Sequence, residues 1–179
     1  MPADPAAPRL TIARFEKALH DRSAFSCGHA AIDNFLKLSL SDQVRAGMVV
    51  AYVATAAEAP DVLGFYTLGA MAVRAELEPG KWRRAGVPDI PVIYLRAIAV
   101  RADMQGRGLG TALVVDALRR CREIADRMGA AAVVLDVLED EWVERRRAFY
   151  ARLGFRPLGD PEMPQRVFLP MADVRATLG

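Results

Sequence analysis

Apolar residues recur at intervals of three and four in three segments, which is the spacing of one face of an α-helix. The longest predicted helix runs from Gly108 to Met128, and Gly129 fits its end. Shorter helices are predicted over 30–46, ending at Gly47, and over 141–153. The expected inward residues are Leu109, Ala112, Leu113, Ala117, Cys121, Ile124 and Met128 in the long helix, Ile32, Phe35, Leu36 and Ser39 in the first, and Trp142, Ala148, Phe149 and Leu153 in the last.

Continuous or alternating apolar runs predict strands between and around these helices. The expected strands are 10–15, 48–55, 62–68, 92–100, 132–137 and 166–169. Residues 74–91 contain charged and turn-forming clusters and are predicted to be a long exposed loop. No repeat or linker divides the chain, so we expect a flexible segment over residues 1–9 and a single domain over residues 10–179.

The composition indicates the general class of protein but not the reaction that it catalyses. The 179 residues are 53% hydrophobic and 26% charged, which is typical of a soluble globular domain. The longest apolar run, 48–57, is about half of the ~20 residues that a membrane span needs, and the N-terminus has no signal-peptide pattern. We therefore expect a cytoplasmic protein with reduced thiols at Cys27 and Cys121. The two histidines lack metal-ligand spacing, so no metal site is predicted.

The chemistry concentrates in the stretch QGRGLG, residues 105–110, which lies between a predicted strand and the long helix. The first amides of a helix lack acceptors within it, and glycines let the backbone approach a phosphate closely. A Walker loop would need a lysine after the last glycine, and a dinucleotide fingerprint would need a third glycine where Thr111 stands. A glycine-rich turn that only starts a helix is the alternative without function.

Gln105-x-x-Gly108-x-Gly110 resembles the Q/R-x-x-G-x-G/A loop of the GNAT acyltransferases, which holds the pyrophosphate of acetyl-CoA. The apolar strand 94–100, the strand 132–137 and the segment AFYARLGF, residues 148–155, resemble other parts of that family in the same order. The resemblance implies an α/β GNAT fold, in which a mixed and centrally splayed sheet has helices on both faces. It also implies these cofactor-binding residues: Ile98, Ala99, Val100, Gln105, Gly106, Arg107, Gly108, Leu109, Gly110 and Thr111.

By the same resemblance, Tyr150 is the expected catalytic residue. Main-chain amides of Ile98 and Val100 would stabilise the oxyanion that forms when an amine attacks the thioester. Tyr150 would protonate the leaving thiolate, since a phenol with a pKa of about 10 stays protonated at neutral pH. The alternative is a tyrosine that only packs in the core. No general base stands near these motifs, which favours an acceptor such as an α-amine, whose pKa of about 7.7–8.0 leaves part of it neutral at pH 7.

The N-terminal third narrows the resemblance to one group within the family. The segment SAFSCGHAAIDNFLK, residues 23–37, is similar to the FxCGxxxLDxFL opening of the GNAT toxins of toxin–antitoxin modules. Residues 62–68 and 90–95 resemble two further segments of those toxins. The resemblance implies acetylation of the α-amine of aminoacyl-tRNA, arrest of translation, a homodimer, and neutralisation by a ribbon-helix-helix antitoxin.

Basic residues are compatible with a tRNA substrate, although the net charge is only +2. The candidates for tRNA contact are Arg22, Arg45, Lys81, Arg83 and Arg84, together with Arg101 and with Trp82 as a residue that stacks on a base. A solvated loop is the alternative for residues 81–84.

Two departures from the toxin pattern stand out. Arg96 is displaced by one position, and the run before Tyr150 is longer and more charged. An acetyltransferase for a small-molecule or protein amine therefore stays open, as does a non-catalytic acyl-CoA-binding module, against which Tyr150 argues.

Overall fold

The computed structural model describes residues 9–78 and 80–178. The expectation of a flexible segment over residues 1–9 falls almost wholly outside this range. The described residues fall into two compact units, of residues 9–68 with 97–117 and of residues 69–78 and 80–96 with 118–178. The single domain expected over residues 10–179 stays a prediction, and each unit is described by itself below.

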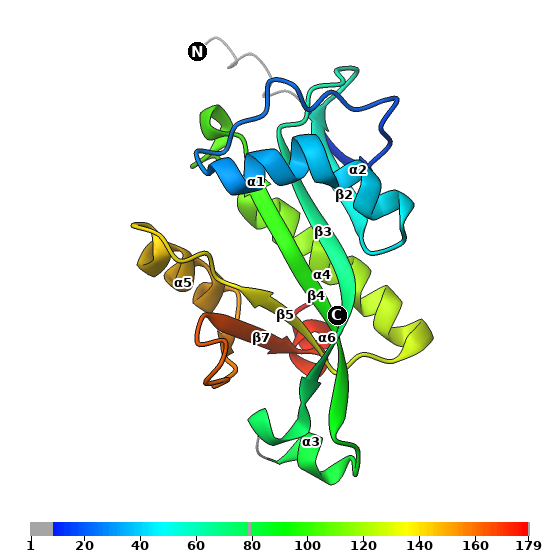
Figure 1. The fold of residues 1–179 in the computed structure, drawn as a ribbon, viewed down its shortest axis with the longest axis vertical. Coiled ribbons are helices and arrows are strands. Elements are labelled where there is room, and N and C mark those ends of the chain that lie inside the picture. Colours follow the sequence, from blue (N-terminus) through cyan, green and yellow to red (C-terminus); the bar gives the residue numbers. More distant parts are fainter. Residues whose placement is uncertain (1–8, 79, 179) are drawn as a thin grey trace, which may run out of the picture. The chain divides into compact units, whose positions relative to one another are not determined.

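Seven strands form one sheet in the order β1-β2-β3-β4-β5-β7-β6 (Figure 1). β4 and β5 are parallel, whereas the pairs β1–β2, β2–β3, β5–β7 and β6–β7 are antiparallel. The predicted α/β fold with a mixed sheet is thereby confirmed. The strands are β1 (Leu10–Arg14), β2 (Val50–Ala56), β3 (Gly64–Arg74), β4 (Asp89–Val100), β5 (Ala132–Asp136), β6 (Arg156–Pro157) and β7 (Arg166–Pro170).

In the first unit a helical run packs against β2 and β3 (Figure 1). The run consists of α1 (Ala30–Asn34), a π-helical turn (Phe35–Ser39) and α2 (Leu40–Arg45), and Gly47 follows it with a φ of +72°. Leu36 and Leu40 are fully buried in a cluster that also contains Phe25 and Phe65. Ser39, predicted to face inward, is exposed, because the wider π turn shifts the buried position to Leu40.

In the second unit the structure corrects the prediction for residues 74–91. These residues are not one long exposed loop: they form a short 3₁₀ turn (Ala75–Leu77), the helix α3 (Lys81–Arg84) and the start of β4. Trp82 is only 8% exposed and packs against Phe168 of β7, with ring centroids 5.5 Å apart. Trp82 is the one apolar residue of α3 and is buried, while the three basic residues of the helix are exposed, which turn signals alone do not reveal.

The long helix α4 (Leu109–Met128) and the helix α5 (Val143–Arg152) are present as predicted. Some of the residues on their buried faces differ from those expected. In α4 the buried side chains include the expected Leu109, Leu113, Ala117 and Cys121, together with Val114, Leu118 and Ala125. The expected inward residues Ala112 and Met128 are exposed, the latter to 69%. Trp142, also predicted to face inward, is 53% exposed because α5 begins one residue after it, at Val143.

Tyr150 is the buried residue of α5, while Ala148, expected to face inward, is exposed. The last helix, α6 (Met171–Leu178), follows β7 directly and was not predicted from the sequence. In the described part of the chain, no helix is both long and apolar enough to cross a membrane.

Candidate active site

The glycine-rich loop of the first unit connects the end of β4 to the start of α4. A 3₁₀ turn (Ala102–Met104) follows the strand, residues 105–108 form a further turn, and α4 begins at Leu109. Gly106 and Gly108 have φ values of +73° and +84°, which L side chains rarely adopt. A Cβ added at either glycine would meet no atom within 4 Å, so there is open space at both positions. Glycine is therefore required here by the backbone conformation and not by a close neighbour.

The amides of this loop are free to bind an anion. The first backbone hydrogen bond of α4 runs from the Ala112 amide to the Gly108 carbonyl, at 3.1 Å. Within residues 9–78 and 80–178, the amides of residues 106–111 have no backbone acceptor. The positive end of the helix dipole adds to these donors, and Arg107 is exposed beside them. The residues present therefore fit the pyrophosphate for which the sequence predicts this loop.

The side chain of Gln105 is used to hold the loop in place. Its Nε2 donates hydrogen bonds to the carbonyl oxygens of Cys27, at 3.0 Å, and Val100, at 2.9 Å. Both amide hydrogens are then engaged within the protein. Leu109 also points inward, being only 3% exposed. Any contact of Gln105 or Leu109 with the cofactor is therefore expected from their main-chain groups, and this contact stays a prediction.

The strand before the loop separates from its parallel neighbour within the second unit. The ladder of β4 and β5 contains Ile93↔Val133 and Tyr94↔Val134 and, for the residues the structure describes, goes no further. Yet β4 continues to Arg96 within this unit and β5 continues to Asp136. The end of this ladder agrees with the splayed sheet expected from the resemblance. Contact of the cofactor with the later residues of β4, Ile98, Ala99 and Val100, stays a prediction.

Tyr150 is buried in the second unit, with its hydroxyl uncommitted. Its ring lies between Phe149 and Phe155, with centroid distances of 5.1 and 5.8 Å. Burial raises its pKa to about 12, and the charge of Arg146 opposes this only in part. No described residue forms a hydrogen bond with the Tyr150 hydroxyl. The ring lines a pocket of about 210 Å³ together with Phe155, Val167 and other residues of α5, β6 and β7.

A second tyrosine in the same unit shows the contrasting arrangement. Tyr94 of β4 donates its hydroxyl hydrogen to Asp136 of β5, at 2.9 Å. Arg166 of β7 binds the same carboxylate through two nitrogens, at 2.7 and 2.9 Å. Burial, and then the hydrogen bond to Asp136, raise the pKa of Tyr94 to about 12. The sequence analysis missed this network, which ties three strands together; no spacing in the sequence signals it.

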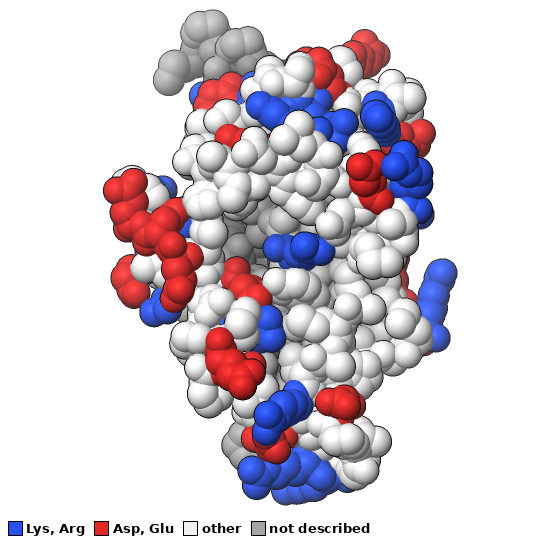
Figure 2. All heavy atoms as spheres, viewed as in Figure 1, with Lys and Arg blue, Asp and Glu red and all other residues white. Residues whose placement is uncertain are grey.

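Three of the predicted tRNA-binding residues keep exposed cations. Lys81, Arg83 and Arg84 are exposed on α3, and none of them forms an ion pair with a described residue. Figure 2 shows a group of basic side chains over the part of the second unit where Figure 1 places α3. Trp82 lies among them in sequence but is buried, so the prediction that it stacks on a base is wrong.

The other predicted basic residues have structural partners in the first unit. Arg22 donates to the Leu36 carbonyl at 2.8 Å and lies over the Phe15 ring, 5.1 Å from its centroid. Arg45 pairs with Asp42 at 2.7 Å on the surface, and Arg101 binds both oxygens of Asp103. These contacts reduce, without abolishing, the capacity of Arg22, Arg45 and Arg101 to bind phosphates.

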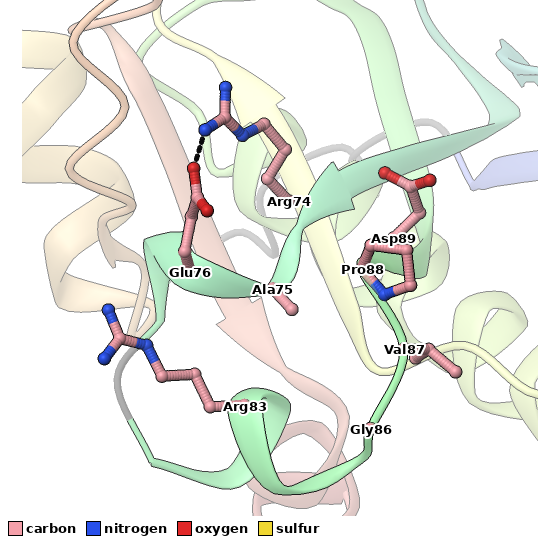
Figure 3. Close-up of a pocket in the computed structure, with 8 residues that line it drawn as sticks. All are labelled: Arg74, Ala75, Glu76, Arg83, Gly86, Val87, Pro88 and Asp89. Carbon is pink, nitrogen blue, oxygen red and sulfur yellow. Dashed lines mark ion pairs between the residues drawn. The ribbon is translucent and has the colours of Figure 1, made fainter.

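A pocket near α3 belongs to the turn between β3 and β4 (Figure 3). Its volume is about 440 Å³, and Arg83 projects along one side of it while Arg74 pairs with Glu76 at another. Asp89 balances the remaining positive charge, so the pocket has no preference for an anion. Neither Tyr150 nor the glycine loop contributes to its lining.

Acidic residues crowd the start of the charged run that precedes Tyr150. Figure 2 shows acidic side chains gathered over the region where Figure 1 places α5. Glu139, Glu141 and Glu144 are exposed, and Asp140 forms an ion pair with Arg146. Among the residues that the structure describes, no group of three His, Cys, Asp or Glu side chains is arranged to hold a metal ion.

The short β4–β5 ladder of the second unit and the loop of the first unit, whose amides lack backbone acceptors among the described residues, are two features that the resemblance to the GNAT acyltransferases leads us to expect. Comparison with known families agrees: residues 45–157 match the family described as "Acetyltransferase (GNAT) domain". The chain belongs to the GNAT acetyltransferase family, and the predicted family and enzyme class are confirmed.

Two relatives place the chain near a particular group of that family. "Probable toxin TacT" of Sinorhizobium fredii is 36% identical over 182 residues, covering 99% of each chain. "tRNA-acetylating toxin" of Mycobacterium tuberculosis is 36% identical over 160 residues, which are 89% of this chain and 91% of the relative. The N-terminal toxin-like segment is therefore part of a similarity along nearly the whole chain.

Solved structures of GNAT toxins are also similar to this chain, at lower sequence identity. AtaT complexed with acetyl-methionyl-tRNAfMet has a TM-score of 0.84 and 27% identity, covering 96% of this chain and all of that chain. A mutant AtaT toxin bound to the C-terminus of the antitoxin AtaR and acetyl-CoA has a TM-score of 0.79 and 27% identity, covering 94% and 98%.

Proposed function

We propose that this protein transfers an acetyl group from acetyl-CoA to the α-amine of aminoacyl-tRNA and thereby stops translation. The observation that carries the proposal is the loop of residues 106–111, whose amides have no backbone acceptor in the described chain and whose Gly106 and Gly108 have open space where a Cβ would stand. Acetyl-CoA as cofactor is confirmed by the family and by relatives of known structure. The tRNA acceptor is supported by the relatives that acetylate tRNA or contain acetylated tRNA.

The loop would bind the pyrophosphate through the amides of Gly106–Thr111, with the Arg107 guanidinium adding charge. Since these donors are already oriented, binding requires little reorganisation of the protein. Main-chain groups of Ile98, Ala99 and Val100 would pair with the pantetheine arm. An amide at this strand would also donate to the thioester oxygen as it gains charge, an effect worth roughly 3 kcal/mol per donor.

Tyr150 would act as the general acid. When bound, acetyl-CoA supplies the acetyl group as a thioester; the amine nitrogen forms the new C–N bond as the C–S bond breaks. The Tyr150 hydroxyl donates its proton to the departing sulfur, and the amine nitrogen loses its surplus proton to water. A pKa of about 12 keeps the hydroxyl protonated at any physiological pH, and no hydrogen bond to another described residue competes for its hydrogen.

An α-amine suits a site without a general base. The α-amine has a pKa of about 7.7–8.0, and esterification of the neighbouring carboxyl lowers it further, so a large part is neutral at pH 7. A lysine amine, with a pKa of about 10.4, would need a base to be deprotonated. The exposed cations of Lys81, Arg83 and Arg84 would contact tRNA phosphates, with Arg22 and Arg45 as further candidates.

The proposed partners follow from the same group of relatives. Their structures include a toxin bound to the C-terminus of its antitoxin, so we propose a small ribbon-helix-helix antitoxin for this chain. A homodimer and a cytoplasmic location, where aminoacyl-tRNA is found, complete the proposal.

The test is cell-free translation in the presence of acetyl-CoA, with the wild-type protein and Tyr150→Phe. We expect the wild type to stop synthesis, Tyr150→Phe to permit it, and omission of acetyl-CoA to protect it. Tyr94→Phe is the matched control, because it removes the hydroxyl of a half-buried tyrosine in the same unit, which already donates its hydrogen to Asp136. Transfer to small amines or proteins without any effect on translation would assign the chain to the alternative class of acceptor.

A further inference from the structure

The loop that would bind the coenzyme is attached to a second segment of the first unit, residues 26–28. The Ala102 amide donates to the Ser26 carbonyl at 2.8 Å. The Gln105 side chain donates to the Cys27 carbonyl at 3.0 Å. Two consecutive carbonyls of residues 26 and 27 therefore hold both ends of the turn 102–105, from which the free amides start.

The segment 26–28 is itself held by one carboxylate, that of Asp33 on α1. Asp33 Oδ1 accepts the Cys27 amide hydrogen at 2.9 Å, and Oδ2 accepts the Ser26 hydroxyl hydrogen at 3.0 Å. Burial raises the pKa of Asp33, but the hydrogen bonds from Cys27 and Ser26 more than offset it, so the pKa is lowered and the carboxylate stays ionised. Gly28, with a φ of +91°, lets the chain turn from this segment into α1.

The geometry points to Asp33 as a positioning residue for coenzyme binding, which acts through Ser26 and Cys27 on the Gln105 turn. The hydrogen-bonded chain runs from Asp33 to residues 26 and 27, and from their carbonyls to Ala102 and Gln105. Asp33 has no role in the proposed reaction itself. It belongs to the segment 23–37, whose function the proposed chemistry leaves unexplained. The inference rests on the proposed function only in that coenzyme A binds at residues 106–111.

Asp33 would affect coenzyme affinity because it preorganises the loop that binds the coenzyme. A loop with several free amides binds a pyrophosphate well only if those amides keep one geometry before binding. Without Asp33 the Cys27 amide and the Ser26 hydroxyl lose their acceptor, and the carbonyls that hold the loop are no longer fixed. The coenzyme must then order the loop when it binds, so its affinity falls while the reaction of the bound complex stays the same.

The experiment is isothermal titration of full-length protein with coenzyme A, which needs no acceptor amine. We expect Asp33→Ala to raise Kd about tenfold and to change kcat at saturating acetyl-CoA by less than about twofold. Asp33→Asn keeps one oxygen for the Cys27 amide and should restore most of the affinity. Asp42→Ala is the control, because Asp42 lies on the same helical run and pairs only on the surface with Arg45; its Kd should equal that of the wild type.

A double-mutant cycle with Gln105→Ala separates positioning from general loss of stability. If Asp33 acts through Gln105, the double variant binds coenzyme A no more weakly than the weaker single variant. Fully additive losses, an unchanged Kd in Asp33→Ala, or an equal loss in kcat would overturn the inference. Ser26→Ala, which removes one hydrogen bond, should give a smaller rise in Kd and replaces Asp33→Ala if that variant does not fold. If these binding results are obtained but aminoacyl-tRNA is not acetylated, the proposed acceptor is wrong and the inference about Asp33 still holds.

Discussion

The glycine loop of the first unit and Tyr150 of the second unit prepare their chemistry in opposite ways. In the loop the side chains of Asp33 and Gln105 hold the backbone, and the backbone amides are left free for a ligand. At Tyr150 the aromatic neighbours hold the ring, and one side-chain hydroxyl is left free. The first arrangement predicts effects on coenzyme affinity, and the second predicts effects on the rate of the bound complex.

Tyr94 makes this comparison sharper, because its pKa is raised like that of Tyr150, although Tyr94 is only half-buried and donates its hydroxyl hydrogen within the protein. Both phenols have a pKa of about 12, yet the hydrogen of Tyr94 is donated to Asp136. A raised pKa alone therefore does not make a general acid. The Tyr150 hydroxyl, which has no hydrogen-bond partner among the described residues, supports the prediction that it is the general acid.

The largest expected effect comes from Tyr150→Phe. Loss of a general acid should lower kcat by about 10²- to 10³-fold, with the Kd for coenzyme A within about twofold of wild type. Steady-state release of free thiol from acetyl-CoA measures kcat, and titration measures Kd. Tyr94→Phe, which removes a committed hydroxyl, should lower kcat far less; equal losses in the two variants would refute the assignment.

Trp82→Ala tests the correction made by the structure. Removing a buried indole from the cluster with Phe168 should lower the free energy of unfolding by about 3–5 kcal/mol. Urea denaturation followed by circular dichroism gives this value. A base-stacking role would instead predict a normal stability and weaker tRNA binding.

Alkaline pH should separate Tyr150 from its phenylalanine variant. The folded protein keeps Tyr150 neutral up to about pH 12, whereas the unfolded chain ionises it near pH 10. Its contribution to folding stability is therefore complete below about pH 10 and is lost as the pH rises toward 12. Denaturation at several pH values should show that the wild type loses on the order of 2 kcal/mol more than Tyr150→Phe over this interval. Parallel losses in both proteins would mean that Tyr150 is not buried.

Gly108→Val should act on affinity rather than on rate. A β-branched residue disfavours a φ of +84°, so the loop would rearrange and the Kd for coenzyme A would rise about tenfold or more. Gly159→Val is the matched control, since Gly159 has a φ of +77° and open space in the connection between β6 and β7. It should lose similar stability with an unchanged Kd.

The smallest expected effect concerns the cations of α3. Replacing Lys81, Arg83 and Arg84 together by alanine should weaken tRNA binding several-fold and flatten its dependence on salt. Filter binding between about 50 and 200 mM salt measures both quantities, and coenzyme affinity should not change. An unchanged salt slope would remove α3 from the proposed tRNA surface.

Much of the fold could be predicted because strands and long helices depend on local periodicity. The loop 105–110 could also be predicted, since it needs glycines at fixed positions before a helix. The helix α3 and the inward direction of Trp82 could not, because they depend on contacts with β7, far along the chain. The same holds for the hydrogen bond that the Cys27 amide donates to Asp33 and for the one that Tyr94 donates to Asp136, which join segments that sequence spacing does not relate.

The most direct test of the proposed function is transfer of labelled acetyl from acetyl-CoA to purified aminoacyl-tRNA. After ribonuclease digestion, mass spectrometry identifies the labelled product. The account predicts N-acetyl-aminoacyl-adenosine with the wild type and about 10²-fold less with Tyr150→Phe. Rapid acetylation of simple amines, with no label on the aminoacyl-adenosine of any charged tRNA, would contradict it.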